Sequence, residues 1–155
     1  MPLLSGHSGA GELDDRLRDA SAVTAELMSQ IIAETCRRYP PIRRTRQSVG
    51  IERLIQSGAW TDAAFALIDL ELPQWQVRRI VYDEGEWHCA LSRQRELPEW
   101  LDQSIETRHT DLPLAILTAF VDAQRMDARS TTTSVPTAPR HADVLCEPVC
   151  RNNVA

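Results

Sequence analysis

The sequence places a cysteine beside a histidine, the pairing that nucleophilic catalysis uses, at His88 and Cys89. Both residues belong to a segment that predicts a β-strand, in which successive side chains point to opposite faces. They therefore cannot form a dyad with each other. His109 is another histidine that the fold could bring to Cys89. A free cysteine is commonly a small core residue, and the pattern favours that structural role for Cys89.

A second group of chemical residues lies near the C-terminus, where one histidine and two cysteines suit zinc: His141, Cys146 and Cys150. Three ligands are one short of a closed tetrahedral site, and the spacing contains no C-x-x-C motif. A zinc site would need one more ligand from elsewhere in the chain: Cys36, Cys89 or His88. Incidental thiols in a polar tail are the favoured interpretation.

A short basic collar carries five arginines: Arg37, Arg38, Arg43, Arg44 and Arg46. It contrasts with residues 49–128, where 14 acids outnumber 7 arginines. Nucleic-acid binders present a broad positive face, so this balance argues against nucleic acid as the main partner. Three interpretations of the collar remain: contact with nucleic acid, contact with an acidic surface of this chain or a partner, and a solvated linker.

Catalytic and cofactor signatures are absent from the sequence. Asp83, Glu84 and Glu86 sit in the expected loop of a β-hairpin, where exposed acids are ordinary. There is no glycine-rich phosphate loop, G-x-S-x-G elbow, H-E-x-x-H helix or dinucleotide-binding fingerprint. The sequence therefore supports neither an enzyme activity nor a cofactor.

Length and composition indicate the kind of domain that holds these residues and the compartment where it lies. The chain has 155 residues, enough for one domain, and seven of its eight aromatic residues lie between positions 60 and 120. No apolar run is long enough to span a membrane, and the N-terminus lacks the pattern of a secretory signal. We therefore expect a cytoplasmic protein with reduced thiols.

An amphipathic helix is predicted over residues 13–38, because apolar positions recur at steps of four and three in a partial heptad. It should end before Pro40, since the residue that precedes a proline avoids the helical region. The partial heptad over residues 13–35 favours pairing with a second copy of the chain or with another protein. Residues 1–12 read as a disordered terminus, and residues 39–48 as a basic linker rich in proline and arginine.

The globular domain is predicted over residues 49–127. Two helices should come first, followed by a hairpin whose strands flank the turn at 83–86. A helix from Pro98 to about His109 and an apolar helix from about Asp111 should cover one face of the hairpin. Residues 128–155 lack the apolar surface that ordering requires, which predicts a disordered tail. The expected fold class is α+β: a small helical domain with a central antiparallel β-hairpin, preceded by an amphipathic helix.

Three stretches carry a resemblance to a known group of proteins: 70–75, 82–94 and 112–117. The hairpin stretch, YDEGEWHCALSRQ, is the most distinctive. Through these residues the region from about 51 to 126 resembles a family of short, uncharacterised alphaproteobacterial proteins of the rhizobial type. The resemblance implies no activity. Residues 1–48 and 129–155 fall outside it, which leaves open whether the native start is Met1 or a later codon.

Taken together, these features favour a non-enzymatic protein-interaction or small regulatory module with an unknown protein partner. A small zinc-binding protein and a nucleic-acid binder that uses residues 37–46 are the two alternatives.

Overall fold

The computed structural model describes residues 8–40, 42–93 and 103–132. Within them it has five helices and one three-stranded antiparallel sheet, which confirms the α+β class. The helices are α1 (Ser8–Asp19), α2 (Ala25–Thr35), α3 (Arg46–Gln56), α4 (Trp60–Glu71) and α5 (Leu112–Thr132). The strands are β1 (Gln76–Asp83), β2 (Glu86–Ser92) and β3 (Ser104–His109), in the spatial order β1-β2-β3. Disorder was predicted for residues 1–12 and 128–155, but residues 8–12 belong to α1 and residues 128–132 to α5, so the prediction is wrong at these positions. Residues 1–7 and 133–155 lie outside the described part.

The N-terminal region is two helices, so the prediction of one helix over residues 13–38 is wrong. α1 ends at Asp19, and Thr24 then acts as the N-cap of α2 by accepting a hydrogen bond from the backbone N–H of Leu27 at 3.2 Å. A threonine that can satisfy a free helical N–H favours a new helix start. The periodicity continues across the break because both helices turn their apolar sides toward the same core.

The apolar residues of this partial heptad lie inside the molecule. Leu13, Leu17, Leu27 and Ile31 are all at most 3% exposed and belong to the same core cluster as the residues of α4, α5 and the sheet. The core therefore extends to the N-terminal side of residue 49, where the predicted domain began. A dimer through residues 13–35 would require this core to open. The apolar surface that was predicted for self-pairing is therefore buried within the chain itself.

The β1–β2 hairpin is confirmed. Asp83 pairs with Glu86, and the turn between them consists of Glu84 and Gly85, whose φ angles are +49° and +87°. A two-residue turn with both φ angles positive matches the twist of the flanking strands. The pairing is irregular between Val77 and Arg79, so that Arg78 is the extra residue of a β-bulge.

β3 replaces part of an expected helix. The sequence predicted a helix from Pro98 to about His109, whereas Ser104–His109 pairs with β2 along its whole length. Ile105 and Thr107 alternate with exposed residues, and both point toward α5, where the hydroxyl of Thr107 donates a hydrogen bond to the carbonyl of Ala115 at 2.7 Å. Alternating burial is the strand period, which a short run with few apolar residues does not reveal clearly. The start of the predicted helix lies outside the described residues.

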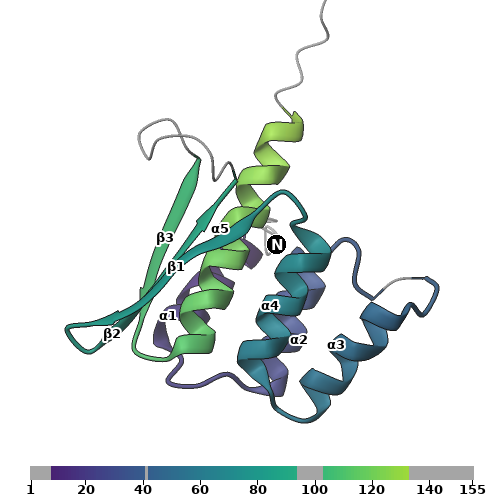
Figure 1. Ribbon diagram of the computed structural model, residues 1–155, viewed down its shortest axis with the longest axis horizontal. Helices are drawn as coiled ribbons and strands as arrows, with labels where there is room; N and C mark the ends of the chain where they lie inside the picture. Colours follow the sequence, from purple (N-terminus) through teal and green to yellow (C-terminus); the bar gives the residue numbers. More distant parts are fainter. Residues whose placement is uncertain (1–7, 41, 94–102, 133–155) are drawn as a thin grey trace, which may run out of the picture.

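α5 is the central layer of the fold. It runs between the sheet and α4, and it packs against β2 and β3 on one side and against α4 on the other (Figure 1). Its first turns are apolar nearly all round, as the sequence predicted, and Ile116, Leu117 and Phe120 are fully buried. α3 lies on the far side of α4. This arrangement covers β2 and β3 with helix and leaves β1 at the margin.

Candidate functional site

The outer edge of β1 is the candidate functional site. β1 is bonded to β2 on one side only, and no described segment pairs with its other side. Within the described residues only three large hydrophobic side chains are exposed: Ile42, Val81 at 41% and Tyr82 at 58%. Two of the three therefore lie on one edge strand. Unpaired strand edges are templates for pairing with another chain.

Side chains on the two faces of β1 differ in character. Ile80 and Tyr82 share the face that the sheet turns toward α5, where Ile80 is half-buried and the Tyr82 ring lies 5.0 Å from that of Trp87. Arg79, Val81 and Asp83 share the opposite face. There Arg79 makes an exposed ion pair of 3.4 Å with Glu106 of β3. The edge thus carries aromatic and aliphatic groups on one face and opposite charges at the two ends of the other.

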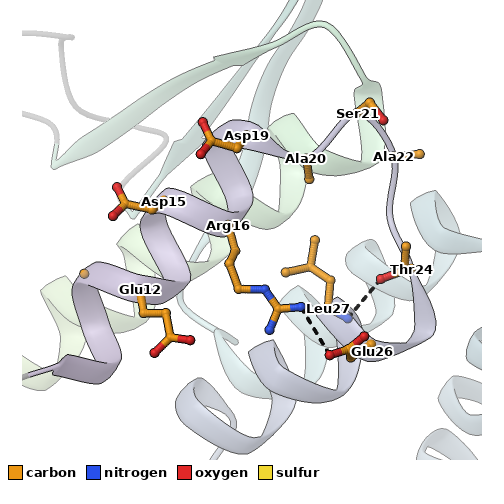
Figure 2. Close-up of a pocket in the computed structure, with 11 residues that line it drawn as sticks. Glu12, Asp15, Arg16, Asp19, Ala20, Ser21, Ala22, Thr24, Glu26 and Leu27 are labelled. Carbon is orange, nitrogen blue, oxygen red and sulfur yellow. Dashed lines mark hydrogen bonds and ion pairs between the residues drawn. The ribbon is translucent and has the colours of Figure 1, made fainter.

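A second surface feature is an open groove of about 990 Å³ between α1 and α2 (Figure 2). Arg16 crosses it and contacts α2 through a hydrogen bond to Gln30 and an ion pair of 3.5 Å to Glu26. The remaining ionisable residues of the lining are acidic: Glu12, Asp15 and Asp19. An exposed acidic groove of this kind is ordinary for a protein of net charge −5, and its central contacts join the two helices.

The basic collar is tied to the body of the protein by its backbone. Glu71 is 6% exposed, and its carboxylate accepts hydrogen bonds from the backbone N–H groups of Arg37, Arg38 and Tyr39 at 2.7–3.0 Å. Gln124 of α5 also donates to this carboxylate, at 3.3 Å. A carboxylate that accepts several backbone N–H groups is a strong local anchor. The segment is therefore held against α4 and α5 at this point.

Two arginine side chains of the collar also bind within the chain. Arg38 donates to the carbonyl of Leu70 at 3.1 Å, and Arg44 pairs with Glu52 at 2.5 Å. Arg46 begins α3, whose N-cap is Thr45. Contact with acidic groups of the same chain is thus present for part of the collar. These contacts occupy some of the donors that a nucleic-acid phosphate would need.

Cys89 and the two histidines do not form a catalytic group. Cys89 is fully buried under α5, and this burial raises the pKa of its thiol from 9.0 to about 11. His88 points to the other face, where its Nδ1 lies 3.5 Å from a carboxylate oxygen of Glu106. His109 shares the face of Cys89, but its Nδ1 accepts the backbone N–H of Asp111 at 3.0 Å. A buried thiol of raised pKa is a poor nucleophile at neutral pH.

The zinc hypothesis falls largely on undescribed residues, since His141, Cys146 and Cys150 lie outside the described part. Among the described residues, no three His, Cys, Asp or Glu side chains are placed to hold a metal ion. Cys36 is a half-buried free thiol whose pKa is raised to about 12, first by burial and then by the charge of Glu71. None of the helices in the described ranges is long and apolar enough to cross a membrane.

Sequence reasoning located the hairpin but missed which of its strands is an edge. With β3 predicted as a helix, both hairpin strands would have been edges, and neither stood out. The signal that was present is the run Arg79–Asp83, in which a basic and an acidic end enclose three β-prone residues.

A scan of protein-family models found no match to this chain, and neither the curated proteins nor the solved structures gave one. The resemblance to rhizobial-type proteins therefore stays a prediction.

Proposed function

We propose that this protein is a non-enzymatic interaction module of the cytoplasm that adds an extended segment of a protein partner to its sheet through β1. The observation that carries the proposal is the coincidence of an unpaired strand edge with Val81 and Tyr82, two of the three large hydrophobic side chains that are exposed in the described residues. In this mode of recognition, backbone hydrogen bonds supply affinity and alternate side chains supply specificity.

The raised pKa values of two thiols support a non-enzymatic role. In the described part of the chain, Cys36 is a half-buried free thiol and Cys89 a buried one. Their raised pKa values leave little thiolate at neutral pH, which disfavours cysteine-based catalysis.

The experiment that tests the proposal blocks the edge with one backbone change. Because Asp83 and Glu86 close a two-residue turn, the N–H groups of Asp83 and Val81 face β2, and those of Tyr82 and Ile80 face outward. Tyr82→Pro removes an outward donor without removing a β1–β2 hydrogen bond, and proline is tolerated at such edge positions. Tyr82→Thr is the matched control, because it also loses the ring but keeps the N–H.

Both variants and the wild-type chain are tagged and used for parallel capture from cells of the native organism, after circular dichroism confirms that they are folded. Proteins that wild type and Tyr82→Thr retain should be lost with Tyr82→Pro. If the three baits recover the same proteins in the same amounts, β1 is not the interaction surface.

A further inference from the structure

Two features set the length of β1 that can accept another strand. The bulge at Arg78 interrupts the strand on one side, and the turn at Glu84 ends it on the other. Between them lies one regular stretch of five residues, Arg79–Asp83, whose midpoint is Val81. Bulges locally disrupt pairing, so they confine any added strand to the regular part.

The end of the hairpin that carries Arg79–Asp83 is accessible. In Figure 1 the β1–β2 turn projects clear of the helices, at the left margin of the molecule. Arg79, Val81, Tyr82 and Asp83 are all exposed. A second sheet edge can therefore approach this half of β1 without displacing a described helix.

We propose that the occupant of this edge is a second copy of the chain, whose β1 pairs antiparallel with the first about a two-fold axis at Val81. This inference rests on the proposed function, because it names the partner that the edge of β1 takes. The product is a continuous six-stranded sheet with the order β3-β2-β1-β1-β2-β3.

The backbone allows this register. Ile80 and Tyr82 turn their N–H and C=O groups outward, because the Asp83–Glu86 pair that closes the turn directs those of Val81 and Asp83 toward β2. With Val81 opposite Val81, each Ile80 lies opposite the Tyr82 of the other copy, and both are outward-facing residues. The two such pairs exchange four hydrogen bonds, and the central Val81 pair is of the closely spaced, non-hydrogen-bonded type. A shift by one residue would place inward-facing groups at the junction.

The side chains complement one another in the same register. Each Arg79 faces the Asp83 of the other copy, which places two opposite-charge pairs at the ends of the junction. Each Ile80 faces a Tyr82, and the two Val81 side chains meet at the centre. A shift by two residues in either direction loses both charge pairs and leaves only three pairs of regular residues. The centred register alone uses all five, so the stretch is self-complementary, as a two-fold interface requires.

The first test exchanges the charges. Arg79→Asp places two acids opposite each other at both ends of the junction, and Asp83→Arg places two bases there. We expect each single variant to dimerise at least about tenfold more weakly than wild type in analytical ultracentrifugation. The double variant Arg79→Asp with Asp83→Arg restores opposite charges and should regain dimerisation. An equimolar mixture of the two single variants should also associate, because each supplies what the other lacks.

The second test traps the axis covalently. In a background with Cys146→Ser and Cys150→Ser, Val81→Cys places two thiols on residues whose Cα atoms lie about 4.5 Å apart, within the range of a disulfide. Mild oxidation should then give a cross-linked dimer on a non-reducing gel. Arg79→Cys is the matched control, since its two copies would lie ~13 Å apart along the strand and should not cross-link.

The outcomes separate this inference from the proposed function. A wild-type chain that stays monomeric at every concentration, without cross-linking through Val81→Cys, overturns the second copy as partner. If proteins captured from cells are still lost with Tyr82→Pro, the edge function stands and its partner is a different chain. A dimer that neither charge exchange weakens, although the variants are folded, places the interface elsewhere and also overturns the inference.

Discussion

The two edges of the sheet are built differently. On β3, Ile105 and Thr107 are buried against α5, and the Thr107 hydroxyl is bonded to the helix backbone. On β1, the corresponding inward residue Ile80 is only half-buried, and Tyr82 is 58% exposed. The chain thus covers β3 with its longest helix, whereas β1 is bonded to β2 and packs against the core only in part, through Val77 and Ile80. A strand that its own fold covers only in part can gain packing from a partner.

Truncating one side chain on each edge strand tests this contrast, and it should give the largest change in the free energy of unfolding. Ile105→Ala removes a buried side chain and should lower the free energy of unfolding by about 2–4 kcal/mol. Tyr82→Ala should cost less than about 1 kcal/mol, because the ring is mostly in solvent and loses chiefly its contact with Trp87. Urea denaturation at low protein concentration, where association contributes least, measures both values. Equal losses would mean that β1 is as firmly packed as β3.

The covered side of the sheet also predicts a dependence on alkaline pH. Burial raises the pKa of the Cys89 thiol from 9.0 in the unfolded chain to about 11 in the fold. A raised pKa contributes stability that is fully present below pH 9 and is lost as the pH rises from 9 to 11. In that window the free energy of unfolding should fall by about 1 kcal/mol per pH unit on account of this thiol.

Cys89→Ala isolates the contribution of Cys89 from those of the other thiols and the tyrosines. The variant is less stable at pH 8 because it leaves a small cavity, but its stability should fall less steeply between pH 9 and 11. Parallel slopes for the variant and the wild type would show that the thiol under α5 is hydrated in the fold, which would contradict the burial of β2.

The elements that the sequence predicted correctly are those whose signals are local. The hairpin depends on a turn with Gly85 between two β-rich runs, and α5 on a long apolar pattern after Asp111. The break between α1 and α2 was missed because a 3.6-residue periodicity continues across it, and the cap that makes it is a single threonine. β3 was missed because its strand state depends on pairing with β2, a contact between residues distant in sequence.

The candidate site follows the same division. The five residues of the β1 edge can be read from the sequence, but that they form an edge depends on β3 occupying the other side of β2. The anchoring of the basic collar by Glu71 was equally hidden, since it joins backbone N–H groups of residues 37–39 to a side chain more than thirty positions away. A glutamate at a helix end carries no mark in the sequence that distinguishes it from an exposed acid.

The smallest expected effect concerns the turn at Glu84 and Gly85, which fixes the end of β1. Glu84 adopts a positive φ of 49°, which most L-residues avoid, whereas asparagine followed by glycine is the preferred pair for this turn. Glu84→Asn should therefore raise the free energy of unfolding by about 0.5–1 kcal/mol. Glu84→Gln removes the same charge without easing the backbone, so it should change stability by less than about 0.5 kcal/mol. A gain for Gln equal to that for Asn would assign the effect to the neighbouring acids Asp83 and Glu86. A gain for Asn alone would show that β1, the less covered edge strand, depends on the conformation of its turn.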